Sequence, residues 1–167
     1  MRSRGFTLIE LMVVLVIIGL VTSLVVVSIG GDSHEQRAEE EVKRAAALLD
    51  LAQEQAILEG KEYGVEWLRD GYRFYRFQNA QWEAIEDDKL FRPRQLEQGL
   101  VIILYVEDDN VPLKDVSGAQ AEPQIVLYSS GERTPFELTV AAPGSRSGPE
   151  LRGKSFGRLQ LEFSDRT

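Results

Sequence analysis

The residue that most invites a chemical interpretation is Glu10, an acid at the start of an apolar stretch. Residues 11–31 contain no charged side chain, a run of 21 residues. A carboxylate carried into a lipid bilayer costs on the order of a few kcal/mol, so it is expected to pair with a cation. We therefore predict a charge-pairing role for Glu10.

The other chemistry-bearing residues form no catalytic set. The chain has no cysteine and one histidine, His34, which excludes disulfides, thiol nucleophiles and cysteine-rich zinc sites. The sequence contains no catalytic triad signature, no HExxH motif and no phosphate-binding glycine loop. We predict that the protein is not an enzyme, binds no cofactor and has no metal site. His34 is interpreted as an exposed linker residue.

Two charged stretches are weaker candidates for ligand binding. Residues 107–110, together with Asp115, could hold calcium, but they lack the ligand spacing of an EF-hand, so we favour a solvated turn. Later in the chain, four cations oppose Glu150 in the one local basic patch of the sequence able to contact DNA or an acidic partner: Arg146, Arg152, Lys154 and Arg158. We interpret this patch as a solvated loop.

The composition fits one folded domain with an acidic surface. The chain has 167 residues, of which 43% are hydrophobic, and a net charge of −8. Because a negatively charged protein repels the phosphate backbone, we do not expect nucleic acid as a partner.

The apolar stretch has the length of a transmembrane helix. Between Phe6 and Ile29, 18 of 24 side chains are apolar, and about 20 such residues span the hydrocarbon core of a bilayer. Arg2 and Arg4 precede the stretch, which predicts a cytoplasmic N-terminus. A cleaved secretory signal, a plain membrane anchor and a leader cut before the apolar run all have this composition. Glu10 disfavours the first two, since neither benefits from an acid there.

Helical periodicity continues beyond the apolar stretch in an amphipathic form. The expected inward face is small and largely apolar and consists of Val42, Ala45, Ala46, Leu49, Ala52, Gln53 and Ala56. Gly60 is expected to end this helix. The two stretches together predict one rod from Phe6 to about residue 59, with any flexibility at Gly30 and Gly31.

After Gly60 the hydrophobic period changes toward two, the period of a β-strand. Residues 63–67 and 72–77, joined through Asp70 and Gly71, predict a β-hairpin. Further strands are expected at residues 82–85, 100–106, 124–128, 136–141 and 158–163, and residues 143–157 form the most loop-like stretch. A helix followed by strands predicts an α+β fold, in which a long N-terminal helix packs against a C-terminal antiparallel β-rich head.

The N-terminus resembles the class III signal of type IV pilins and type II secretion pseudopilins. The basic leader MRSRG ends in Gly5 and precedes FTLIEL and the apolar tail. The resemblance implies that a prepilin peptidase cuts between Gly5 and Phe6 and methylates the new amine of Phe6. That amine, with an ordinary pKa of about 8, would lie about one helical turn before Glu10. The resemblance also implies that Glu10 serves the assembly of subunits into a fibre.

Two later segments resemble minor pseudopilins of the general secretion pathway protein H family, within the type IV pilin-like superfamily. They are residues 63–67 with their Asp-Gly turn and residues 128–138, with the sequence YSSGERTPFEL. Gly131 would permit a turn with positive φ, and Pro135 suits the edge of a returning strand. The resemblance implies a subunit at or near the tip of the type II secretion pseudopilus, which supports export of folded proteins across the outer membrane.

The same resemblance implies partners and a location. The partners are other minor and major pseudopilins, the prepilin peptidase and the inner-membrane assembly platform. The location is the bacterial inner membrane, crossed once, with the head in the periplasm as part of the pseudopilus. Two alternatives stay open: a minor pilin of a type IV pilus with a role in DNA uptake, and a membrane-tethered periplasmic enzyme.

These expectations divide the chain into four parts. Residues 1–5 are the leader peptide, residues 6–29 the transmembrane and fibre-core helix, residues 30–59 the amphipathic continuation of that helix, and residues 60–167 the periplasmic β-rich head.

Overall fold

The computed structural model describes the backbone of residues 8–115 and 121–163, and the side chains of these residues apart from 20–33. The chain divides into two units, Met1–Ser33 and His34–Thr167.

The helical prediction is confirmed over the described residues. Helix α1 runs from Leu8 to Glu59 and is continuous in its backbone through Gly30 and Gly31. It ends where the sequence predicts, because Gly60 adopts a positive φ of 64°, the conformation that closes many helices. The amide of Lys61 donates to the carbonyl of Ala56 across this end, at 3.2 Å.

Within the unit His34–Thr167, α1 presents the predicted inward face. All seven residues of that face are buried: Val42, Ala45, Ala46, Leu49, Ala52, Gln53 and Ala56. Four of them are alanines, whose short side chains let a sheet approach the helix closely. The amide nitrogen of Gln53 donates to the carbonyl of Tyr128 at 2.9 Å, which satisfies one polar group on this face.

The first sheet contains the predicted hairpin. Strands β1 (Tyr63–Leu68) and β2 (Gly71–Gln78) pair antiparallel, with Leu68 opposite Gly71. The order is β3-β2-β1-β7, with β3 at Gln81–Ala84 and β7 at Ile125–Leu127. A two-residue strand, β4 (Arg94–Gln95), pairs with the start of β2.

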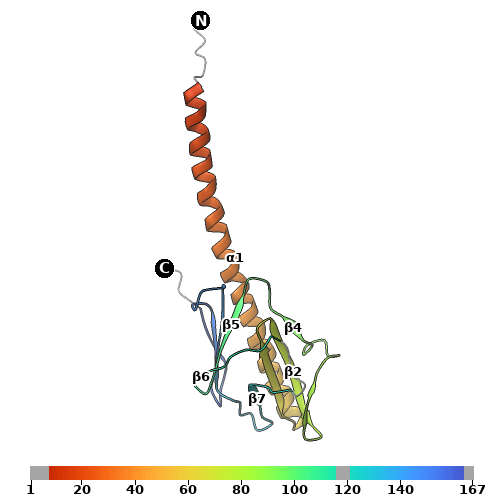
Figure 1. Cartoon of the computed structure of the whole chain (residues 1–167). Coiled ribbons are helices and arrows are strands. Elements are labelled where there is room, and N and C mark those ends of the chain that lie inside the picture. Colours follow the sequence, from red (N-terminus) through yellow and green to blue (C-terminus); the bar gives the residue numbers. More distant parts are fainter. Residues whose placement is uncertain (1–7, 116–120, 164–167) are drawn as a thin grey trace. The chain divides into compact units, whose positions relative to one another are not determined.

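The second sheet is also antiparallel and has the order β10-β9-β8-β5-β6. Its strands are β5 (Val101–Val106), β6 (Asp109–Asn110), β8 (Phe136–Ala141), β9 (Glu150–Gly153) and β10 (Gln160–Glu162). In Figure 1 the sheet with β2 and the sheet with β5 both lie beside the orange part of α1. One hydrophobic core joins the inward face of α1 to both sheets through side chains such as Leu49, Trp67 and Leu138. The α+β prediction is confirmed.

Three short strands were not predicted from the sequence. Strand β9 lies inside residues 143–157, which were expected to be a loop, so that part of the prediction is wrong. Strand β9 carries one large apolar side chain, Leu151, which is fully buried. Its apolar pattern is therefore too short to be recognised as that of a strand. The two-residue strands β4 and β6 contain no apolar residue at all.

The segment after β7 makes the predicted tight turn but not a simple hairpin. Gly131 has a φ of 87°, and Leu127 and Arg133 form an isolated antiparallel bridge across the turn. The chain then leaves the first sheet, because β8 pairs with β5 and β9 of the second sheet. Pro135 therefore precedes an interior strand, and it marks the crossing between the sheets, not an edge strand.

Candidate functional site

The residues predicted for processing and assembly belong to the N-terminal unit. Gly5 and Phe6 lie outside the described residues, so cleavage between them stays a prediction. Glu10 lies in the first turn of α1, and its side chain is exposed. The assembly role of Glu10 stays a prediction as well.

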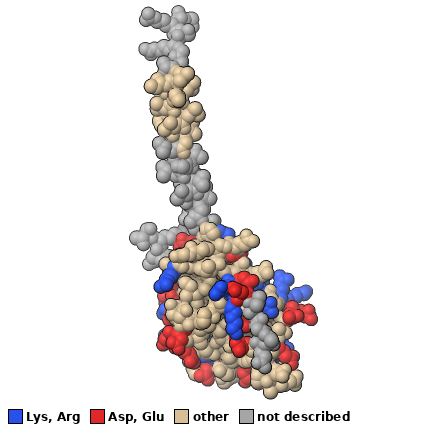
Figure 2. Space-filling view, in the orientation of Figure 1, with Lys and Arg blue, Asp and Glu red and all other residues tan. Residues whose placement is uncertain are grey.

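The described side chains around Glu10 form an apolar surface. Exposed apolar residues follow one another from Leu8 to Ile18, with exposed fractions from 42% at Val14 to 76% at Leu8. Figure 2 shows this part of α1 as a continuous tan surface on the face in view. Because consecutive helical residues point in different directions, the apolar surface surrounds the helix instead of forming one stripe. Exposed apolar surfaces of this kind mark sites of contact with another protein or a membrane.

A membrane crossing by residues 6–29 stays a prediction. Among the described residues, no helical segment is both long enough and apolar enough to cross a membrane.

His34 is not the exposed linker residue expected from the sequence. Its ring is partly buried, and its Nδ1 lies 3.0 Å from an Nη atom of Arg37, one turn along α1. Gly99 packs against the ring so closely that a Cβ at this glycine would lie 2.8 Å from the ring Cε1. His34 therefore packs against Gly99, in the segment just before β5, and joins this segment to α1.

The acidic stretch at residues 107–110 is a turn, as favoured from the sequence. Glu107 and Asp108 are the two central residues between β5 and β6, with φ values of 52° and 72°. Two residues with positive φ are typical of a type I′ hairpin turn. Asp115 pairs instead with Arg69 at 3.1 Å. No group of acidic or histidine side chains among the described residues has the arrangement of a metal site.

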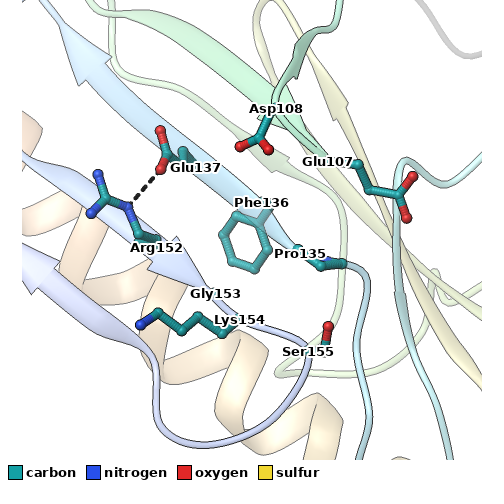
Figure 3. Close-up of a pocket in the computed structure, with 9 residues that line it drawn as sticks. All are labelled: Glu107, Asp108, Pro135, Phe136, Glu137, Arg152, Gly153, Lys154 and Ser155. Atoms are coloured by element: carbon teal, nitrogen blue, oxygen red, sulfur yellow. Dashed lines mark ion pairs between the residues drawn. The ribbon is translucent and has the colours of Figure 1, made fainter.

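A hollow of about 330 Å³ lies beside this turn. It is lined by residues at the end of β5, at the beginning of β8 and at the end of β9. In Figure 3, the Phe136 ring lies among the lining residues, with Asp108 on one side and Lys154 on the other. The guanidinium of Arg152 pairs with Glu137 at 2.7 Å. Acidic and basic side chains are mixed around this hollow, so it selects no particular charge.

One member of the late basic patch predicted from the sequence, Arg152, is neutralised by acidic side chains. Arg152, in β9, lies within ion-pair distance of three carboxylates, those of Glu137, Glu150 and Glu162, at 2.7, 2.6 and 3.7 Å. Glu137 lies directly opposite Arg152 on β8, Glu150 lies two residues before it on β9, and Glu162 lies opposite Glu150 on β10. The interpretation of this segment as a freely solvated loop is therefore wrong at Arg152.

The buried carboxylate of Glu41 was missed by sequence reasoning. Glu41 is 2% exposed, and it accepts hydrogen bonds from Tyr72 at 3.2 Å and Arg44 at 2.7 Å. Burial, followed by the negative charge of Glu41, raises the pKa of Tyr72 and keeps its hydroxyl protonated as a donor. The signal was present in the spacing, because Glu41 lies three residues after buried Ala38 and four before buried Ala45.

Comparisons with known proteins agree with this architecture. Residues 1–26 match the prokaryotic N-terminal methylation motif, and residues 41–154 match the family described as type II transport protein GspH. Type II secretion system protein H of Pseudomonas aeruginosa is 36% identical over 163 residues, which cover 92% of this chain and 89% of the relative. The protein of the same name from Escherichia coli is 30% identical and covers 86% of this chain and 84% of the relative.

Solved structures share the fold. The crystal structure of the minor pseudopilin EpsH from the type II secretion system of Vibrio cholerae has a TM-score of 0.68 at 22% identity, and it covers 80% of this chain and 98% of that structure. The solution structure of Escherichia coli GspH has a TM-score of 0.61 at 22% identity, with 78% and 90% covered. The resemblance stated from the residues alone is confirmed, and the chain belongs to the GspH family of type II secretion proteins.

Proposed function

We propose that this protein is a minor subunit of a type II secretion pseudopilus, located at or near the fibre tip, where it supports the export of folded proteins. The observation that carries the proposal is the apolar surface of α1 between Leu8 and Ile18, which lies within the matching N-terminal methylation motif at residues 1–26. Such a helix has no use in an isolated soluble protein, whereas a fibre core supplies apolar neighbours on all sides.

The first step is processing of the N-terminus. A prepilin peptidase removes residues 1–5 by hydrolysing the Gly5–Phe6 peptide bond, and the new amine of Phe6 is methylated. The positive amine of Phe6 and the negative carboxylate of Glu10 then lie about one helical turn apart, because Phe6 is four residues before Glu10. The amine of one subunit pairs with Glu10 of its neighbour, which sets the register between helices.

The second step is transfer from the membrane to the fibre. Residues 6–29 cross the inner membrane once, with the N-terminus in the cytoplasm and residues 60–167 in the periplasm. Moving an apolar helix from lipid into a bundle of similar helices exchanges one apolar environment for another, so the hydrophobic effect opposes the transfer little. The directional work comes from the inner-membrane assembly platform, with other minor and major pseudopilins as the neighbours in the fibre.

The role is structural and not catalytic. The relatives are named as secretion-system proteins, and the mixed charges around the hollow at Phe136 offer no convergent set of acid, base and nucleophile.

Deletion of the gene tests the proposal directly. We expect exoprotein secretion to be lost and pilus-dependent motility to be retained, and expression of the full chain to restore secretion. Intact secretion after deletion would overturn the proposal. Mass spectrometry of the membrane-extracted protein tests the processing step, since a mature N-terminus other than methylated Phe6 contradicts it.

A further inference from the structure

A second hollow of the head is lined by arginines. It has a volume of about 530 Å³ and lies between the turn that joins β1 to β2 and the short strand β4. Its charged lining consists of four arginines and one aspartate: Arg44, Arg73, Arg92, Arg94 and Asp70. We call this site the arginine pocket. The sequence gives no hint of it, because Arg44 lies on α1 and the others are spread over β2 and the segment through β4.

Backbone contacts between β4 and the start of β2 fix one wall of the arginine pocket. Strand β4 pairs with β2 so that Gly71 lies opposite Gln95 and Tyr72 opposite Arg94. The approach is close, since a Cβ on Gly71 would lie 1.9 Å from the carbonyl oxygen of Arg94. The carbonyl of Asp70 accepts a hydrogen bond from the amide of Leu96 at 2.7 Å. Arg94 therefore belongs to a segment that is held by its backbone against residues 70–72, and not to a free loop.

Much of the positive charge in the pocket is uncompensated. Arg44 is paired with the buried carboxylate of Glu41 at 2.7 Å. Arg73 and Arg92 form no ion pair with an acidic side chain in the described part of the chain. Arg94 donates through Nη2 to the carbonyl of Leu90 at 3.1 Å, and its buried Nε has no hydrogen-bond partner among the described residues.

Several other arginines of the head are paired with acids. Arg152 has three carboxylates around it, Arg76 pairs with Glu59 at 3.3 Å, and Arg69 pairs with Asp115 at 3.1 Å. The whole chain carries a net charge of −8, so four arginines gathered around one hollow form a local excess of positive charge. Guanidinium groups recognise carboxylates through paired hydrogen bonds.

We propose that the arginine pocket binds an acidic segment of a neighbouring polypeptide in the assembled fibre. The identity of the partner as a fibre neighbour rests on the proposed function, whereas the binding itself does not. The cations come from α1, β2 and the segment through β4, a spread that suits several carboxylates along a chain. Strand β4 pairs with β2 on one side, so its other edge offers backbone groups to an extended segment.

Peptide binding to the full chain in zwitterionic detergent tests the proposal. The probe is a fluorescent hexaglutamate peptide with blocked ends, and hexaglutamine serves as the uncharged control. We expect the double variant Arg73→Gln/Arg92→Gln to bind hexaglutamate about tenfold more weakly, a loss of about 1.4 kcal/mol. Arg146→Gln, an exposed arginine outside the pocket, removes one positive charge and is expected to bind like the unaltered chain.

The remaining outcomes are equally decisive. Equal affinities for the double variant and the unaltered chain would overturn the proposal, as would equal binding of hexaglutamate and hexaglutamine. Vesicles containing phosphatidylglycerol and solutions of inorganic phosphate are tested in parallel. Arginine-dependent binding to either of these, without binding to hexaglutamate, would overturn the peptide proposal in favour of a phosphate site. None of these results depends on secretion, so the proposed function and the pocket can fail separately.

Discussion

One helix, α1, contains two stretches that differ in the exposure of their apolar side chains. Between Leu8 and Ile18 its apolar side chains are exposed, whereas Val42, Leu49 and Ala52 of the later stretch are at most 2% exposed. Both stretches are helical, so backbone conformation does not distinguish them. The difference lies in what covers the apolar surface: the later stretch is covered by the chain's own sheets, and the earlier stretch needs a cover from outside.

We infer that the early stretch serves assembly and that the later stretch stabilises the head. Substitutions in the early stretch should act on assembly and leave the fold of the head intact. Substitutions on the buried face of the later stretch should act on the stability of the head.

The largest effect is expected at Glu10. The Glu10→Val variant should abolish exoprotein secretion while the protein accumulates in the membrane at an ordinary level, because the amine of Phe6 loses its partner. The control is Glu40→Val, which makes the same change at an exposed position of the later stretch. Secretion assays and immunoblots of membrane fractions measure both variants. Normal secretion by Glu10→Val would contradict the charge-pairing role.

Two leucines on the same helix test the separation most directly. Leu49→Ala should lower the free energy of unfolding of the head by about 2–5 kcal/mol, because it removes a core side chain and leaves a cavity. Leu15, which is 68% exposed, should tolerate the same change without a measurable loss. Urea unfolding of the full chain in detergent, followed by tryptophan fluorescence, reports on the core through Trp67. Equal effects at the two sites would refute the separation.

A larger side chain on the buried alanine face of α1 should destabilise the head. Ala52→Leu forces extra volume between α1 and the sheets and should destabilise the head by about 1–3 kcal/mol. Ala47 lies on the same helix with an exposed side chain, so Ala47→Leu should leave the unfolding midpoint nearly unchanged. A destabilisation by Ala47→Leu that matches Ala52→Leu would show that the effect is not one of packing.

The sequence predicted the parts of the fold that long periodic patterns determine. The buried face of α1 and the strand β8 (Phe136–Ala141) agree with their predictions because each repeats apolar residues at the period of its own element. Strands β4 and β9 were missed because each depends on pairing with a distant strand and carries little apolar signal of its own. Periodicity describes one segment at a time, so it does not report such pairings.

The candidate sites divide in the same way. The processing motif at Gly5, Phe6 and Glu10 is contiguous, so it could be recognised in the sequence, although its residue roles stay predictions. The arginine pocket and the neutralisation of Arg152 arise from strands far apart in the chain. Charge counted along the chain grouped Arg152 with a basic patch, but carboxylates from β8, β9 and β10 compensate that arginine.

The smallest effect is expected from Asp50, on the solvent side of the later stretch of α1. Partial burial raises the pKa of Asp50 above its ordinary value, although the positive charge of Arg133 acts in the opposite direction. A raised pKa in the folded state means that ionisation favours unfolding, so the cost is present at neutral pH and disappears as pH falls below the ordinary value of 3.8. Asp50→Asn should therefore be slightly more stable than the unaltered chain at pH 7. The advantage should shrink toward pH 3 in urea unfolding measured across that range. Glu40→Gln, measured alongside, corrects for the change in net charge, and an advantage that grows as the pH falls would show that Asp50 is stabilised as the carboxylate.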